Sequence, residues 1–195
     1  MARWDPGTEE RLTKAALELY REHGYDSVTV TRIAERAGIT RRSYFRYFPD
    51  KREVLFAGSE RLPAAAADAV LAADRSAPPL TAALDGIARA GARLTSYVDV
   101  GHATERRAVI DSSAELQERE RTKLASVATA VSDALGRRGV DPGRADLVAR
   151  IATVAFRSAF AQWIDARGEL DFASCFSTVV TTLRETVVAD IECGD

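Results

Sequence analysis

Apolar residues recur at spacings of three and four along almost the whole chain, a pattern that is typical of amphipathic helices. No segment alternates apolar and polar residues between turn signals, as a half-buried strand would. Glycine, proline and residues that favour helix caps interrupt the helical pattern at intervals. We therefore predict an all-α protein with about nine helices.

The first predicted helix begins at Asp5 and Pro6, a capping residue followed by a proline at the first helical position. It ends at His23 and Gly24, a cation near the negative pole of the helix and then a residue that tolerates positive φ. The apolar stripe that we expect to be buried consists of Leu12, Ala15, Ala16 and Leu19.

The next segment predicts two short helices joined by a glycine turn. Thr29 can cap the first of these helices, and Gly38 breaks it. Thr40 can cap the second, which is predicted to run through Phe48. The order helix, glycine turn, helix is that of a helix-turn-helix motif.

Further helices follow the motif. Residues 50–53 have the form of a capping box that opens a fourth helix, and Pro63 is expected to kink or end it. Residues 75–79, which include two prolines, are the strongest linker candidate. Later helices are predicted from about Leu80 to Tyr97, around Ala103 to Ile110, from Ser112 to Gly136, from Asp141 and Pro142 onward, and from a cap at Asp171.

The 195 residues, 46% of them hydrophobic, suffice for one domain or for two small ones. The net charge of −2 excludes a strongly basic chain, but it conceals a local excess of cations. Residues 32–52 contain seven basic and two acidic side chains, a net charge of +5, so the remaining residues sum to −7. This basic segment coincides with the predicted helix-turn-helix motif.

The stretch GITRRSYFRYFPDK, residues 38–51, has the chemistry that a DNA-recognition helix requires. Its spacing turns Ile39, Tyr44 and Phe48 inward. Arginines can hold guanine O6 and N7 with both arms, while Tyr47 and Lys51 suit phosphate oxygens. A solvated charged helix face, or a helix-turn-helix that is only a structural corner, remains the alternative. The side chains left facing outward are Arg41, Arg42, Ser43, Phe45, Arg46 and Tyr47.

A longer string of residues resembles the N-terminal domain of the TetR/AcrR family of bacterial transcriptional regulators, over roughly residues 8–56. Tyr44 stands where that family usually has an apolar core residue, so its hydroxyl could reach the surface. Phe45 stands where many members have tyrosine, which puts a phosphate contact there in question. The resemblance is carried by His23-Gly24-Tyr25, Ser27-Val28-Thr29-Val30, Ile33-Ala34, Ala37-Gly38-Ile39-Thr40 and Tyr47-Phe48-Pro49-Asp50-Lys51.

The resemblance implies a DNA-binding domain at residues 1–52 and a ligand-binding and dimerisation domain at residues 53–195. It implies a ligand-responsive repressor that binds a near-palindromic double-stranded DNA operator as a homodimer and responds to a small-molecule effector. The alternative is a helical sensor or interaction protein without specific DNA readout. The DNA-binding residues it implies, together with the reasoning above, are Thr29, Thr40, Arg41, Arg42, Ser43, Phe45, Arg46, Tyr47 and Lys51.

The C-terminal part carries weaker signals. The span from Ile151 to Ile164 is apolar nearly all round, which predicts burial on more than one side. We predict that a thin stripe packs against a second subunit in a four-helix interface made by Ala152, Ala155, Ala159, Val179 and Leu183. A bulky stripe could line a ligand pocket, with ordinary core packing as the alternative: Arg93, Tyr97, Phe156, Arg157, Phe160 and Trp163.

Several function classes are not indicated. The chain lacks GxSxG, GxGxxG, GxxxxGK[ST] and HExxH motifs and has only two histidines, so we predict neither an enzyme nor a cofactor or metal site. Cys175 and Cys193 match no zinc or redox spacing and are expected to be free thiols. The N-terminus lacks the apolar region of a signal peptide, and the most apolar stretch is interrupted by Asp68. We therefore predict a cytoplasmic protein that does not bind membranes.

Overall fold

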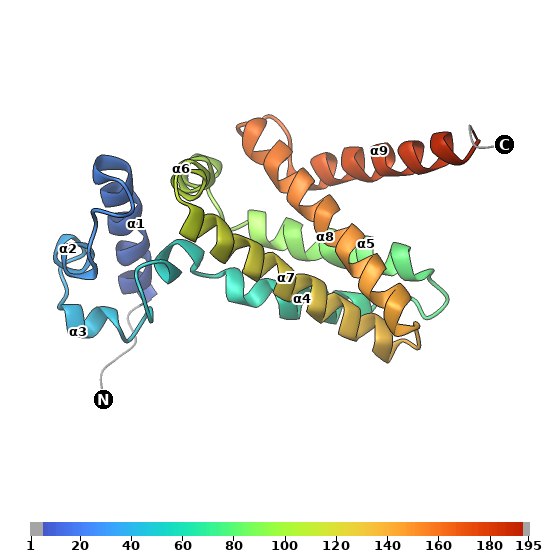
Figure 1. Cartoon of the computed structure of the whole chain (residues 1–195), viewed down its shortest axis with the longest axis horizontal. Coiled ribbons are helices and arrows are strands. Elements are labelled where there is room, and N and C mark those ends of the chain that lie inside the picture. The colour runs from blue at the N-terminus through green and yellow to red at the C-terminus, as the bar shows by residue number, and fades with distance from the viewer. Residues whose placement is uncertain (1–5, 193–195) are drawn as a thin grey trace. The chain divides into compact units, whose positions relative to one another are not determined.

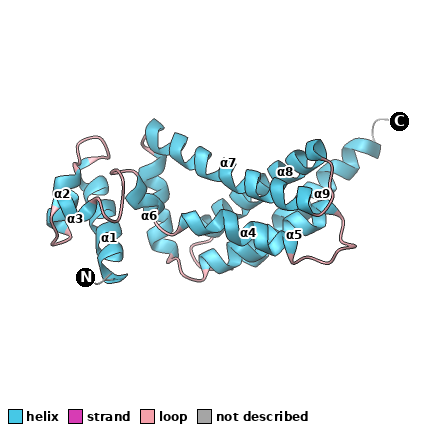
Figure 2. Ribbon diagram, turned by 90° about the horizontal axis from the view of Figure 1, so that it is seen from below, coloured by secondary structure: helices cyan, strands magenta, loops and turns pink. Residues whose placement is uncertain are grey.

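The computed structural model of the chain describes residues 6–192, which contain helices and loops but no strand (Figures 1 and 2). The all-α prediction is therefore confirmed, whereas the predicted cap at Asp5 and the thiol of Cys193 lie outside these residues. Two 3-10 helices, η1 (Glu53–Phe56) and η2 (Ser59–Arg61), accompany the α-helices of the described part. These are α1 (Pro6–His23), α2 (Val30–Arg36), α3 (Arg41–Tyr44), α4 (Leu62–Leu71), α5 (Pro79–Thr95), α6 (Val100–Asp111), α7 (Ala114–Arg137), α8 (Pro142–Asp165) and α9 (Phe172–Glu192).

Helix ends follow local sequence chemistry closely. The Thr29 and Thr40 hydroxyls accept the N–H groups of Arg32 and Ser43, at 3.3 and 3.1 Å, and so cap α2 and α3. Gly38 adopts φ +73° between these helices, a backbone conformation that other residues rarely take. The predicted caps at Asp141 and Asp171 likewise accept backbone N–H groups at the starts of α8 and α9.

Three predictions about helix ends are wrong. The third helix ends at Tyr44 and continues as turns, because Phe48 precedes a proline and the α conformation is disfavoured there. No regular fourth helix starts at residue 50; the 3-10 helix η1 stands in its place. Pro63 neither ends nor kinks a helix but lies in the first turn of α4, where its missing N–H leaves no bond unmade.

The described chain forms two compact units that do not follow the predicted boundary after residue 52. The first unit extends to Glu60 and adds residues 104–123, and the second holds residues 61–103 and 124 onward. The chain passes from the second unit to the first within α6, after residue 103, and returns to the second unit within α7, after residue 123. The division into residues 1–52 and 53–195 is a functional one and stays a prediction.

The first unit is built on a core that α1, α2, α3, η1 and the residues from α6 and α7 share. The largest side chains without solvent exposure include Tyr44 and Phe56. Val109, Ile110 and Leu116 from α6 and α7 belong to this core, which explains why residues far along the chain fold with the N-terminal helices.

The second unit consists of α4, α5, α8 and α9 with the C-terminal part of α7. Helix α5 packs against α4, α8 and α9, and α8 packs against α9. Two glycines of α5 make close approach possible: a Cβ at Gly86 would lie 2.7 Å from Val70 Cγ2, and one at Gly91 would lie 2.4 Å from Phe172 Cε1. Any larger residue at either position would force neighbouring side chains apart.

No helix within residues 6–192 combines the length and the apolar character that a membrane crossing requires.

Candidate DNA-binding surface

Helix α3 is fixed to the first unit by the buried side chain of Tyr44. Its ring is fully buried, and its hydroxyl donates a hydrogen bond to the Asp50 carbonyl oxygen at 2.9 Å. Burial raises the pKa of this hydroxyl, so it remains a protonated donor. The expectation that the hydroxyl of Tyr44 could reach the surface is therefore wrong. The hydroxyl instead ties α3 to the segment that follows it.

The turn between α2 and α3 sets the direction of the second helix. Ile39 N–H bonds to the Ala34 carbonyl at 2.9 Å, and Gly38 N–H bonds to the Glu35 carbonyl at 3.0 Å. These bonds satisfy carbonyls at the C-terminus of α2 while Gly38 reverses the chain. The Thr40 hydroxyl then caps α3 and also lies 3.0 Å from the Ser43 hydroxyl. Because the turn is closed by backbone bonds, it holds α3 in one orientation.

Four arginines of this region are exposed, and none of them forms an ion pair with any residue of the part that the structure describes: Arg32, Arg41, Arg42 and Arg46. Exposed cations without a carboxylate partner retain their full charge for an external anion. Arg32 was counted in the basic segment but was absent from the predicted contact residues. Because Arg32 is exposed on α2, we add it to the candidate DNA-contact residues.

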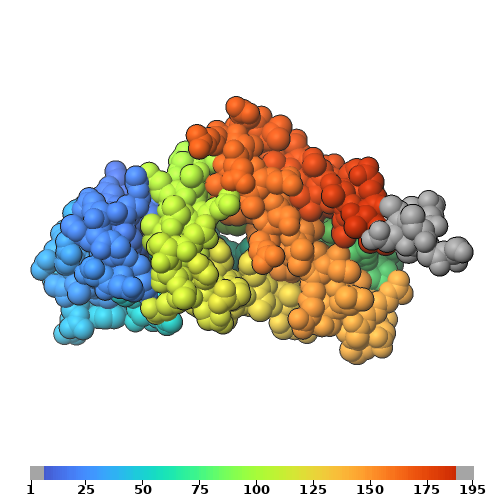
Figure 3. Space-filling model, turned by 45° about the horizontal axis from the view of Figure 1, so that its top comes forward, coloured from blue at the N-terminus to red at the C-terminus, as the bar shows by residue number. Residues whose placement is uncertain are grey.

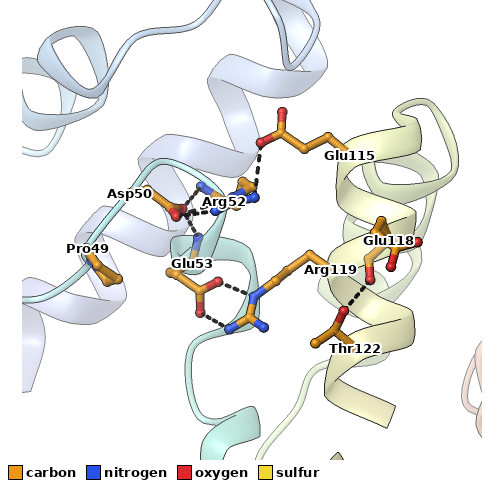
Figure 4. A pocket seen from close by; sticks show the side chains of 8 residues that line it. All are labelled: Pro49, Asp50, Arg52, Glu53, Glu115, Glu118, Arg119 and Thr122. Carbon is orange, nitrogen blue, oxygen red and sulfur yellow. Dashed lines mark hydrogen bonds and ion pairs between the residues drawn. The ribbon is translucent and has the colours of Figure 1, made fainter. Parts of the chain in front are cut away.

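The other cations of the basic segment are engaged within the unit. Arg36 lies 3.0 Å from Glu22 and 3.5 Å from Glu18, both on α1. Arg52 pairs with Asp50 at 2.7 Å and with Glu115 at 3.4 Å (Figure 4). The local charge of +5 therefore overstates the number of cations that DNA could meet directly.

Lys51, predicted to meet a phosphate, has a structural role in this conformation. It is half-buried, and its ammonium donates to the carbonyl oxygens of Tyr25 at 3.0 Å and Val28 at 3.3 Å. The same ammonium lies 4.0 Å from the centroid of the Tyr25 ring. Lys51 thus braces the turn that precedes α2, and its predicted DNA contact stays a prediction.

The remaining predicted contact residues lie around α3. Thr29 and Thr40 are exposed at the starts of their helices, whereas Ser43 and Tyr47 are half-buried. Phe45, a large apolar residue, is 45% exposed. Arg41, Arg42 and Ser43 therefore lie on one short, capped helix, and Phe45, Arg46 and Tyr47 lie in the turn that follows it.

A second cluster of charges surrounds η1, and the sequence analysis missed it. Glu53, with a side chain only 15% exposed, receives a bidentate pair from Arg119 of α7 (Figure 4). Lys123 lies 3.4 Å from the same carboxylate. The hydrogen bonds from Arg119 lower the pKa of Glu53 below its ordinary value. Glu53 and Arg119 border a groove of about 480 Å³ whose lining also includes the charged residues Asp50, Arg52, Glu115 and Glu118.

Phe56, the last residue of η1, lies under two cations. The Arg106 guanidinium carbon is 4.9 Å from the ring centroid, and the Lys123 ammonium is 5.1 Å from it. Arg106 Nε also donates to the Leu55 carbonyl at 2.6 Å, and Lys123 donates to the Ser59 hydroxyl at 3.0 Å. Cations from α6 and α7 therefore hold η1 in place.

The predicted pocket residues do not gather in one cavity. Phe156, Phe160 and Trp163 pack together in the core of the second unit. The ring centroids of Phe156 and Phe160 are 5.8 Å apart, and those of Phe160 and Trp163 are 5.3 Å apart. Tyr97 is 81% exposed, and Arg93 and Arg157 are exposed as well. None of these six residues lines the groove beside η1 or the groove between Arg75 and Arg144. The aromatic stripe is packed as core, the alternative interpretation of its spacing.

The alanine stripe predicted to meet a second subunit is buried inside one chain. Ala152, Ala155 and Ala159 are at most 3% exposed, because α5 and α9 pack on that side of α8. Side chains buried in their own subunit cannot form an intermolecular surface, so this part of the prediction needs correction. Val179 and Leu183 on α9 are half-buried and remain available.

Within the described residues, no group of three or more histidine, cysteine, aspartate or glutamate side chains could hold a metal ion.

Comparison with known proteins gives matches in the same region as the surface above. Residues 12–57 match the family model for bacterial regulatory proteins of the tetR family. TcmR of Streptomyces glaucescens, an HTH-type transcriptional regulator, is 43% identical over 47 residues, 24% of this chain and 21% of TcmR. YdeS of Bacillus subtilis (strain 168), an uncharacterized HTH-type transcriptional regulator, is 34% identical over 64 residues, 30% of this chain and 32% of YdeS. These matches span a third or less of each relative.

Solved structures share the fold over nearly the whole chain. NalD of Pseudomonas aeruginosa matches with a TM-score of 0.58 at 18% identity, over 93% of this chain and 97% of NalD. SmeT in complex with triclosan matches with a TM-score of 0.57 at 20% identity, over 90% of this chain and 91% of SmeT. FadR of Thermus thermophilus, a TetR-family repressor in complex with lauroyl-CoA, matches with a TM-score of 0.52 at 21% identity, over 91% of this chain and 93% of FadR. Residues 12–57 thus match the tetR family of bacterial regulatory proteins, and the chain shares its fold with these solved structures over nearly its whole length.

Proposed function

We propose that the chain is a ligand-responsive repressor that reads a near-palindromic DNA operator as a homodimer. One observation carries the DNA-binding part: the arginines of α3 are exposed and unpaired within the described residues, on a helix that Tyr44 and Thr40 hold rigidly. Arginine side chains on a fixed helix can contact guanine edges in the major groove without first breaking an internal ion pair. The exposed Arg32 on α2 would add a phosphate contact.

The homodimer proposal rests on an exposed apolar stripe of α8 that replaces the alanine stripe. Leu147 and Val154 are 59% and 55% exposed, and the half-buried Ile151 lies between them on the same side of the helix. Helix α9 packs against α8, and the two helices lie side by side in orange and red in Figure 3. On α9, Leu183 is half-buried and Val187 is 51% exposed. Two adjacent helices with apolar stripes at this spacing suit a four-helix interface with a second copy.

A two-fold dimer explains why the operator should be near-palindromic. An isologous pair presents the same helix twice, and half-sites in successive major grooves are about 34–36 Å apart. The operator is thus expected to repeat one short sequence on both strands.

The effector proposal is supported by the structural relatives that are described as complexes with triclosan and with lauroyl-CoA. A small molecule that favours one conformation of the second unit would act through α6 and α7, since both helices contribute residues to both units. The coupling must be reciprocal: DNA weakens effector binding by the same factor by which the effector weakens DNA binding.

Selection of duplexes from a random DNA library at about physiological salt tests the function directly. The expected result is an enriched near-palindrome whose affinity falls steeply with salt. A folded protein that enriches no sequence would contradict the proposed repressor and favour the helical sensor without DNA readout. The enriched duplex would also supply the probe for every binding experiment below.

The dimer interface is tested by Val154→Arg, which places a charge in the proposed stripe. Light scattering should then report a monomer with an unchanged helical circular dichroism spectrum. Thr81→Arg, an exposed substitution on α5, should stay dimeric. By contrast, Ala155→Arg should unfold the second unit, because the position is 3% exposed within one chain. A dimer that survives Val154→Arg would move the interface elsewhere.

A further inference from the structure

Phe45 is a large apolar side chain left in water in the middle of a cationic surface. Among the described residues of the helix-turn-helix, it is the only large hydrophobic side chain with substantial exposure. Its neighbours Arg41, Arg42 and Arg46 are all exposed as well. A phosphate group has no apolar surface for a phenyl ring, whereas the thymine methyl group in the major groove has one.

Two contacts hold the ring of Phe45 in place. Its edge meets the buried ring of Tyr44, with centroids 5.7 Å apart and planes at 83°. Its face meets the Arg41 guanidinium, whose carbon lies 5.5 Å from the ring centroid. Tyr44 is fixed in the core and contacts the ring of Phe45, and this ring in turn contacts the guanidinium of Arg41. The guanidinium is thereby oriented before any DNA is bound.

The two exposed groups have complementary preferences among base edges. Arginine selects guanine through O6 and N7, and phenylalanine makes apolar contact with the thymine 5-methyl group. Arg41 and Phe45 are four residues apart, so they lie on the same side of the helix about one turn, roughly 5.4 Å, apart along its axis. With base pairs stacked about 3.4 Å apart, the two side chains would reach base pairs one or two steps apart.

We propose that Arg41 and Phe45 form one reading unit that selects a guanine and, one or two base pairs away, a thymine recognised by its methyl group. The inference rests on the proposed DNA binding and adds to it the composition of each half-site. Phe45 is the specificity-determining residue for thymine, and it positions Arg41 for guanine. The competing role for Phe45 is to cover Tyr44 only, which would leave base preference untouched.

Two base analogues test the unit on the duplex enriched from the random library. Each thymine is replaced in turn by deoxyuridine, which lacks only the methyl group, and each guanine by 7-deazaguanine, which lacks the N7 acceptor. We expect one thymine per half-site at which deoxyuridine weakens binding by about fourfold, the effect of one buried methyl group. That thymine should lie one or two base pairs from a guanine whose 7-deaza replacement also weakens binding.

Variants then assign the two positions to their side chains. Phe45→Ala should bind the thymine and deoxyuridine duplexes equally, and Arg41→Ala should lose sensitivity to 7-deazaguanine. Phe45→Leu should keep the preference for thymine but weaken the preference for guanine, since a leucine cannot stack under the guanidinium. Tyr97→Ala removes an exposed aromatic side chain outside the DNA-binding unit and should change neither preference.

The outcomes separate the inference from the function on which it rests. If duplexes are enriched but no thymine shows a methyl effect that Phe45→Ala abolishes, the reading unit is refuted while DNA binding stands. The same holds if Phe45→Leu leaves the guanine preference unchanged, because positioning of Arg41 would then be disproved. If no duplex is enriched, the proposed function fails and the inference fails with it. Thermal unfolding of each variant shows that a lost preference does not come from a lost fold.

Discussion

Two groups of cations in the first unit differ in their surroundings although the residue types are the same. Arg41 and Arg42 on α3, and Arg46 in the turn that follows it, are exposed and have no ion-pair partner within the described residues. Arg106 and Arg119, from α6 and α7, are partly buried against η1, each beside a carboxylate and with a hydrogen bond to an oxygen of η1. Partners and exposure, and not residue type, therefore decide whether a cation stabilises the fold or remains available for DNA.

The difference has an energetic reason. An exposed arginine keeps its hydration, so its removal changes stability little. A partly buried arginine has given up water for a carbonyl or a carboxylate, and its removal leaves that oxygen without a partner. The first group is thus expected to affect DNA affinity without affecting stability, and the second to affect stability first.

The largest expected effect belongs to Arg106→Ala. Its guanidinium bonds to the Leu55 carbonyl and covers the ring of Phe56, and burial lowers its pKa. Removing it should reduce the free energy of unfolding by about 2–3 kcal/mol, measured by urea denaturation. Arg46→Ala, an exposed arginine of the first group, is the matched control and should stay within about 0.5 kcal/mol of the parent. Equal losses in both variants would erase the contrast between the two groups.

The next effect concerns binding. Arg42→Ala should weaken binding to the enriched duplex by about 1–3 kcal/mol if this arginine contacts a guanine, and should relax base preference at that position. Its melting temperature should not change, since the side chain is exposed and has no ion-pair partner among the described residues. Fluorescence anisotropy against the enriched duplex and against single-base variants measures both effects. Unaltered binding to every duplex would remove Arg42 from the reading surface.

A smaller, pH-dependent effect is expected for Glu53→Gln. The pKa of Glu53 is held below its ordinary value of 4.5 by hydrogen bonds from Arg119 and by the charge of Lys123. A lowered pKa stabilises the fold above the unfolded-state pKa, and this contribution is lost as the pH falls through the folded-state pKa. At pH 7 the variant should be less stable than the parent by about 1–2 kcal/mol.

Denaturation at a series of pH values checks the sign of this effect. The stability gap between the parent and Glu53→Gln should be widest above about pH 5 and should narrow as the pH falls below 4.5, where the parent carboxylate takes up its proton. Glu118→Gln, an exposed glutamate of the same groove, is the control. A gap that stays constant down to pH 3 would show that the charge of Glu53 does not contribute.

The same contrast explains how much the sequence could foretell. The caps at Thr29 and Thr40 and the turn at Gly38 depend on neighbours within a few residues, so the helix-turn-helix motif was predictable. The pair between Glu53 and Arg119 joins residues 66 positions apart. No local pattern marks such a pair, because each partner alone resembles any solvated charge.

Helix α8 shows a different limit. A helix that is apolar nearly all round gives no indication of which side meets its own subunit, and Ala155 was assigned to the wrong side. The spacing of Leu147, Ile151 and Val154 was visible in the sequence. It became informative only when the exposure of these residues showed that the subunit leaves them uncovered.

Lys51 lies between the two groups, and its variants give the smallest and most discriminating effect. If Lys51 contacts a phosphate, Lys51→Ala should weaken binding to all duplexes alike and should lower the slope of log affinity against log salt by about one. As a brace on the carbonyls of Tyr25 and Val28 it should also contribute to stability. Lys51→Arg retains the charge and should preserve the slope even if the bonds to the carbonyls are disturbed. A slope unchanged in Lys51→Ala, together with a lower melting temperature, would assign Lys51 to the fold alone and leave the phosphate contacts to exposed residues such as Arg32.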